Sequence, residues 1–162
     1  MSGYSVIGLF NIKSSLNYGG VLRAAQCFGA SAIIIQSKRF EKFSMNTMKA
    51  ERHIPTFLVD NLCQNTPFCC EKVAVEFVDD SKCLTEFKHP KRAYYIFGPE
   101  DGSLGKNIFD KCQHIIKIPS LHCLNLAQTV NIVLYDRILK EKFKHEKIEC
   151  GDFDTKEPKD AR

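Results

Sequence analysis

Six short apolar segments, separated by stretches of ten or more residues, constrain the fold of this 162-residue chain more than any other feature. They are rich in β-branched and aromatic residues, a composition typical of β-strands. The segments are Ser5 to Phe10, Ala32 to Gln36, Thr56 to Val59, Lys72 to Phe77, Ala93 to Phe97 and His114 to Ile118. Because they are almost continuously apolar, they fit a parallel sheet buried on both faces. We therefore predict an α/β fold in which helices cover both faces of a mostly parallel sheet.

Two of the other stretches have the spacing of amphipathic helices. In the first, Asn17 is placed to cap the helix and Gly29 to end it in a left-handed conformation. Its apolar stripe consists of Val21, Ala24, Ala25 and Phe28. Arg23 lies outside this stripe. The second helix is predicted from Asn125 to Lys144.

One domain is expected from the length and from a hydrophobic content of 44%. We predict that it covers residues 1–144, and that the charged residues 145–162 form a frayed tail. No apolar run approaches the ~18 residues of a membrane span, and the beginning of the chain lacks the pattern of a secretory signal. We therefore expect a cytoplasmic protein that has no membrane partner.

The chain has enough cysteine for disulfides or a metal site to be considered. The eight residues are Cys27, Cys63, Cys69, Cys70, Cys83, Cys112, Cys123 and Cys150. A chain with this hydrophobic content can form a core without disulfides, so we expect reduced thiols packed as small apolar side chains. The pairs nearest to zinc-ligand spacing are Cys112 with His114 and His122 with Cys123. Neither pair has the usual gap, so no metal is expected.

The charge of the chain is compatible with a nucleic-acid partner. The net charge is +4 and the isoelectric point is near 8.6, which permits binding to a polyanion without establishing it. The stretch from Arg39 to His53 concentrates basic residues between aromatic ones. It fits either a solvated amphipathic helix or a surface that faces phosphates, and both interpretations remain open.

Three segments that follow predicted strands have residues suited to ligand binding. The first, from Asn17 to Gly29, has two glycines at a helix start, where either a phosphate or a packed backbone can come close. The second, from Tyr95 to Gly105, leads from a strand into a loop with three glycines and two acids, where open α/β sheets hold ligands. The third, from Ile116 to Ala127, leads into the last helix, for which Asn125 is also a candidate N-cap.

The three segments carry motifs in a fixed order. They read Asn-x5-Arg-x5-Gly from Asn17, Phe-Gly-Pro-Glu-x3-Leu from Phe97, and Ile-Pro followed by x-Leu-Asn-Leu and a helix ending in Leu-Tyr-Asp. This order resembles the SpoU/TrmH branch of the SPOUT RNA methyltransferases. The resemblance covers about Tyr4 to Lys140.

The resemblance implies a fold, an activity and partners. It implies a C-terminal trefoil knot whose loops bind S-adenosylmethionine, and a homodimer that completes the active site. The implied reaction is methylation of a ribose 2′-hydroxyl in RNA. A chain without an added RNA-binding domain is similar to the minimal tRNA-modifying members, so tRNA is the expected substrate and ribosomal RNA the alternative.

The resemblance also assigns site residues. The residues assigned to catalysis are Asn17, Arg23, Glu100 and Asn125. Those assigned to the cofactor are Phe77, Val78, Phe97, Gly98, Pro99, Glu100, Ile118, Cys123, Leu124, Asn125 and Ala127. Because a guanidinium stays protonated, it is a poor general base. We therefore expect Arg23 to clamp the phosphate beside the reacting ribose and to stabilise the developing alkoxide.

Two positions depart from the family pattern. Cys123 and Ala127 stand where serine is usual, and a thiol forms weaker hydrogen bonds than a hydroxyl. A catalytically silent knotted RNA-binding module is therefore an alternative function. A flavodoxin-like redox or nucleotide protein is another alternative, although the chain has no C-x-x-C motif.

Overall fold

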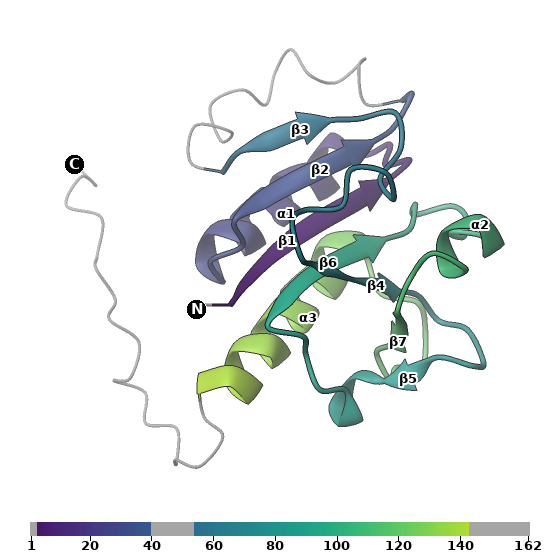
Figure 1. The fold of residues 1–162 in the computed structure, drawn as a ribbon. Helices are drawn as coiled ribbons and strands as arrows, with labels where there is room; N and C mark the ends of the chain where they lie inside the picture. The colour runs from purple at the N-terminus through teal and green to yellow at the C-terminus, as the bar shows by residue number, and fades with distance from the viewer. Residues whose placement is uncertain (1–2, 40–53, 143–162) are drawn as a thin grey trace, which may run out of the picture.

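The structure is a computed structural model that describes residues 3–39 and 54–142. Within these ranges, seven parallel strands form one sheet in the order β3-β2-β1-β6-β4-β7-β5 (Figure 1). The strands are β1 (Tyr4–Phe10), β2 (Ala32–Gln36), β3 (Thr56–Leu58), β4 (Glu71–Val75), β5 (Lys82–Cys83), β6 (Arg92–Phe97) and β7 (His114–Lys117). The helices are α1 (Ser15–Cys27), the 3-10 turn η3 (Leu84–Glu86), α2 (Lys106–Phe109) and α3 (Leu126–Lys142). The predicted α/β fold with a parallel sheet is confirmed.

Each of the six predicted apolar segments coincides with a strand. The largest difference is in β4, which ends at Val75, so that Glu76 and Phe77 follow the strand instead of continuing it. The short strand β5 was not predicted, because two residues are too few to show a pattern. Within the described residues, no helix is long and apolar enough to cross a membrane.

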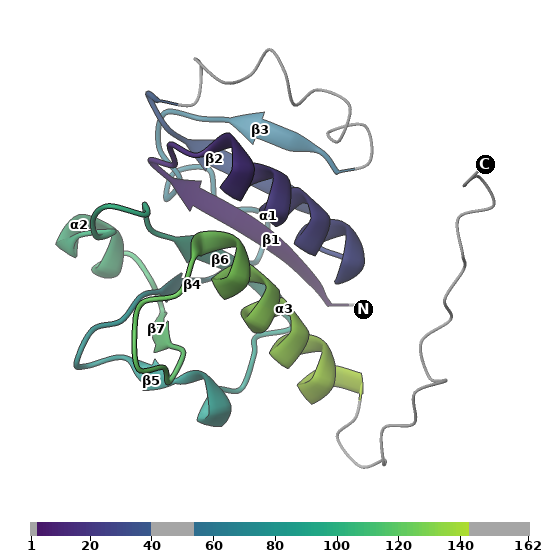
Figure 2. The ribbon, with the colours of Figure 1, turned by 180° about the vertical axis from the view of Figure 1, so that it is seen from behind.

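Helices lie on both faces of the sheet, but they cover the two faces unequally. α1 and α3 pack side by side on one face (Figure 2), where their apolar side chains meet Ile7, Leu9 and Tyr95 of the sheet. On the other face, the four-residue α2 contributes Ile108, which packs in the same cluster as Tyr94. The larger part of the core therefore lies between the sheet and the pair α1 and α3.

The start of α1 differs from the prediction. Ser14 is the N-cap, and its side chain accepts a hydrogen bond from the backbone N–H of Asn17 at 3.2 Å. The prediction that Asn17 caps the helix is therefore wrong, since Asn17 lies inside the first turn and its side chain is available for other contacts. The predicted end is confirmed, because Gly29 has a φ of 66° directly after the C-cap residue Phe28.

The two glycines near the start of α1 have different surroundings. A Cβ at Gly20 would lie 2.6 Å from the Cβ of Ala127 in α3, whereas a Cβ at Gly19 would meet nothing within 4 Å. Because side chains cannot approach that closely, the absence of one at Gly20 allows α1 and α3 to touch. Tight packing therefore explains Gly20.

A buried polar cluster anchors the later turns of α3. Arg137 is 4% exposed and donates to the carbonyl oxygen of Pro90 at 2.7 Å. The His89 ring lies between the Tyr95 hydroxyl, at 2.6 Å, and the Asp136 carboxylate, at 2.8 Å. Burial lowers the pKa of His89, although Asp136 acts in the opposite direction.

The helix α3 begins at Leu126, one residue after the predicted start, and the predicted tail 145–162 lies outside the described residues. The same holds for the basic stretch from Arg39 to His53, of which only Arg39 belongs to the described part.

Candidate active site

A cavity of about 220 Å³ opens where three neighbouring parallel strands end. Its walls come from the residues that follow β4, β6 and β7 and from the start of α3. In an open parallel sheet, this edge is where loops gather and ligands bind. The cavity is therefore the first candidate for a binding site.

Most of the residues that the sequence assigned to a cofactor line this cavity. They are Phe77, Phe97, Gly98, Pro99, Glu100, Ile118, Cys123 and Leu124. Val78, Asn125 and Ala127 are not among the lining residues. Asn125 instead accepts a hydrogen bond from the backbone N–H of Ala127 at 2.9 Å, as an N-cap of α3 does.

The sequence analysis missed several residues that line the cavity. They are Val75, Glu76, Gly102, Ser120 and Thr129. The sequence analysis missed Glu76 because the predicted strand extended to Phe77, which placed this acid inside the sheet. An acid directly after the apolar run Val73 to Val75 was the signal that the strand ends earlier.

Three of the four residues assigned to catalysis form one hydrogen-bonded chain. Asn125 donates through Nδ2 to Oδ1 of Asn17 at 2.7 Å, and Asn17 donates through Nδ2 to Oε1 of Glu100 at 2.6 Å. The other oxygen of Glu100 accepts from the backbone N–H of Lys13 at 3.4 Å. These hydrogen bonds join the first turn of α1, the loop after β6 and the start of α3 beside the cavity.

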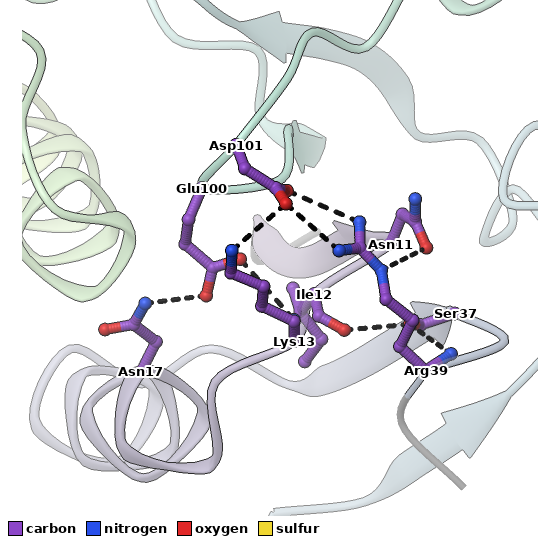
Figure 3. A network of polar contacts seen from close by, with 8 residues as sticks. All are labelled: Asn11, Ile12, Lys13, Asn17, Ser37, Arg39, Glu100 and Asp101. Atoms are coloured by element: carbon purple, nitrogen blue, oxygen red, sulfur yellow. Dashed lines mark hydrogen bonds and ion pairs between the residues drawn. The ribbon is translucent and has the colours of Figure 1, made fainter. Parts of the chain in front are cut away.

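The loop after β6 is also held by ion pairs on its outer side (Figure 3). The Asp101 carboxylate is 3.0 Å from Nζ of Lys13 and 3.2 Å from NH1 of Arg39. Arg39 and Lys13 donate hydrogen bonds to Asp101 and thereby lower the pKa of its carboxyl group to about 2. Arg39 also donates through Nε to Oδ1 of Asn11 at 3.2 Å. The loop is therefore tied to the ends of both β1 and β2.

On its inner side, the same loop is tied to β4. The half-buried Glu76 accepts through Oε2 from the backbone N–H of Leu104 at 2.8 Å, and its own N–H donates to the carbonyl oxygen of Ile116 at 2.9 Å. Glu76 therefore connects the loop to the strands β4 and β7.

Arg23 does not contact the other residues assigned to catalysis in the same chain. Its side chain is exposed on α1, and no hydrogen bond or ion pair links it to another described residue. The reason is geometric, because six helical positions separate it from Asn17 and place the two side chains about 120° apart around the helix. Within the described residues, no group of three or more His, Cys, Asp or Glu is arranged to hold a metal.

Comparison with known proteins identifies a family. The model of the family described as "SpoU rRNA Methylase family" matches residues 4–135. A "Putative TrmH family tRNA/rRNA methyltransferase" of Staphylococcus haemolyticus is 24% identical over 142 residues, which cover 82% of this chain and 57% of that protein. An "Uncharacterized tRNA/rRNA methyltransferase" of Archaeoglobus fulgidus is 24% identical over 144 residues, covering 82% of this chain and 63% of the relative. The chain thus spans about three fifths of the length of these relatives.

Solved structures share the fold. An AdoMet-bound rRNA methyltransferase from Sinorhizobium meliloti superposes with a TM-score of 0.75 and 21% identity, covering 87% of this chain and 58% of that chain. The TrmH/SpoU tRNA modifying enzyme of A. aeolicus has a TM-score of 0.73 and 20% identity, and the match covers 87% of this chain and 79% of that chain. A structure described as giving insights into the 2-OH methylation of C/U34 on tRNA has a TM-score of 0.69 and 21% identity. The match covers 85% of this chain and 90% of that chain.

Proposed function

This chain belongs to the SpoU rRNA methylase family, and we propose that it transfers a methyl group from S-adenosylmethionine to a ribose 2′-hydroxyl of RNA. Membership implies the C-terminal trefoil knot that the sequence predicts. The observation that carries the proposed activity is the hydrogen-bonded chain of Asn125, Asn17 and Glu100 beside the cavity. It gathers motif residues from three distant segments at one place.

The cavity suits the adenosine part of S-adenosylmethionine. Val75, Phe97, Ile118 and Leu126 give it apolar walls that can enclose a purine, and Gly98 leaves backbone accessible at its edge. The similar Sinorhizobium meliloti protein was solved with AdoMet bound, which supports the same cofactor here. When bound, the cofactor supplies an electrophilic methyl group on a sulfonium.

The residues of this chain provide positioning more than chemistry. Methyl transfer requires the 2′-oxygen in line with the bond that breaks, so holding both ligands at one angle supplies much of the rate. Asn17 holds the Glu100 carboxylate, which lines the cavity, and Asn125 in turn holds Asn17. We assign Arg23 to the phosphate next to the reacting ribose, where its forked donors can bind two oxygens.

A second copy of this chain is the proposed partner. Arg23 lies away from the other site residues of its own chain, so in this proposal Arg23 of the partner subunit completes the site. Large exposed apolar side chains next to site residues support such a surface: Leu16, which precedes Asn17 in α1, is 87% exposed, and Leu121, which follows the lining residue Ser120, is 97% exposed. Sedimentation of the purified chain measures its oligomeric state directly. A monomer at assay concentration contradicts the proposed dimer.

tRNA is the proposed substrate. The chain covers 90% of the protein whose structure concerns methylation of C/U34 on tRNA, but only 58% of the Sinorhizobium rRNA methyltransferase. The fold of this chain therefore accounts for a larger share of the former protein, which favours tRNA.

The activity is tested by incubating the purified chain with methyl-labelled S-adenosylmethionine and either tRNA or ribosomal RNA. We expect label in tRNA that maps to a ribose 2′-oxygen, and binding of S-adenosylmethionine to the protein alone by calorimetry. Label in ribosomal RNA only corrects the substrate. RNA binding without donor binding or label identifies the silent knotted module instead.

A further inference from the structure

The cavity proposed for the cofactor has an acidic lining. Glu76 and Glu100 are its charged residues, and among the described residues that line it there is no lysine, arginine or histidine. A partly enclosed site lined by one sign of charge attracts ligands of the opposite sign. The cavity is therefore suited to a ligand that carries positive charge.

The two acids are not equally engaged. Glu100 accepts hydrogen bonds on both oxygens, from Asn17 and from the backbone of Lys13. Glu76 accepts one, on Oε2 from Leu104, and within the described part of the chain its Oε1 has no hydrogen-bond donor. Since Glu76 is half-buried and lines the cavity, its uncompensated oxygen is the stronger source of negative potential there.

Two lysines that adjoin lining residues, Lys117 before Ile118 and Lys13 beside Glu100, have other partners. Lys117 donates through Nζ to the carbonyl oxygens of Val78 and Asp79, each at 3.4 Å, and its Nζ lies 5.7 Å from the centre of the Phe77 ring. Lys13 is paired with Asp101 at 3.0 Å. Neither lysine lines the cavity, and neither is paired with Glu76.

We propose that Glu76 makes this cavity select the positively charged methyl donor over the neutral product of the reaction. The inference rests on the proposed function. In methyl transfer the carbon–sulfur bond of the sulfonium breaks, sulfur keeps the electron pair and becomes a neutral thioether, and a carbon–oxygen bond forms at the ribose. The hydroxyl proton passes to solvent. Donor and product therefore differ by one positive charge at sulfur, and the attraction to Glu76 disappears when the methyl group leaves.

This selection has a kinetic consequence. Attraction to the sulfonium stabilises the bound donor at least as much as the transition state, in which the positive charge is already dispersing. Removal of the Glu76 charge should therefore raise KM for the donor while leaving kcat nearly unchanged. A residue that only holds the loop after β6 in shape would instead lower kcat when altered.

The test compares binding of S-adenosylmethionine and S-adenosylhomocysteine by calorimetry. For the wild-type chain we expect the donor to bind about fivefold more tightly than the product. In Glu76→Gln, which keeps a carbonyl oxygen for Leu104, we expect weaker donor binding and a ratio near one. Glu76→Asp, which keeps the charge, and Glu86→Gln, which alters an exposed acid outside the cavity, should retain the wild-type ratio.

A second measurement needs no variant. The wild-type preference for the donor should shrink as KCl rises from about 0.05 M to about 0.5 M, because salt screens the attraction. A ratio near one in the wild-type chain, or a ratio unchanged in Glu76→Gln, overturns the role of Glu76 while leaving the methyltransferase proposal intact. If neither ligand binds the wild-type chain, it is the proposed function that fails.

Discussion

Asn17 and Asn125, which are 108 positions apart in the sequence, are joined side chain to side chain by a 2.7 Å hydrogen bond. This bond connects the first turn of α1 to the residue before α3. Asn17 donates a second hydrogen bond to Glu100. A hydrogen-bonded arrangement of this kind aligns the site only while all its members are present.

Replacement of Asn17 by alanine should lower methyl transfer. Asn17→Ala removes both the bond from Asn125 and the bond to Glu100, so we expect kcat to fall about tenfold or more. Donor affinity should change by less than about threefold, because Asn17 does not line the cavity. Calorimetry and single-turnover assays separate the two effects. Asn107→Ala, on the exposed surface of α2, is the control, and equal activity of both variants would contradict the role.

The phosphate clamp assigned to Arg23 can be tested with a conservative change. Arg23→Lys keeps the charge but loses the fork of donors, so we expect transfer to RNA to fall about tenfold. Because the side chain is exposed, the midpoint of thermal unfolding should not move. Near-normal turnover of Arg23→Lys rules the clamp out.

The contact between α1 and α3 predicts opposite effects at two adjacent glycines. Gly20→Ala places a Cβ 2.6 Å from Ala127, so we expect a loss of about 1–3 kcal/mol in the free energy of unfolding. Gly19→Ala meets nothing within 4 Å and should stabilise the helix by about 0.5–1 kcal/mol. Chemical denaturation measures both values. Stabilisation by both variants would show that helix propensity, rather than packing, governs the pair.

The buried His89 predicts that stability falls in mild acid. Burial lowers the pKa of His89 in the folded chain, whereas in the unfolded chain it titrates near ~6.5. Below that pH the unfolded state binds more protons than the folded state, so the free energy of unfolding decreases as pH falls, by up to about 1.4 kcal/mol per pH unit. Denaturation at a series of pH values checks this. His89→Phe should be less stable at neutral pH but should lose less on acidification, and His122→Asn, at an exposed position, should behave as wild type.

Local patterns were sufficient to predict most of the secondary structure. Strands β1 and β6 are buried on both faces, which requires nearly continuous apolar residues and makes them visible in the sequence. The end of α1 was predictable because the positive φ at Gly29 favours glycine. The motif order also indicated the loops that form the cavity, since these loops directly follow the strands.

The sequence by itself thus determined the class of the fold, the strand positions and the segments that carry the site, because these depend on the burial and backbone preferences of neighbouring residues. Only the tertiary structure decided that Ser14 caps α1, that Asn17 joins Asn125 to Glu100, that Glu76 faces the cavity and that Arg23 lies apart from them. These relationships depend on the strand order and on the packing of α1 against α3, and pairings between residues so far apart in the chain leave no periodic trace in a single sequence.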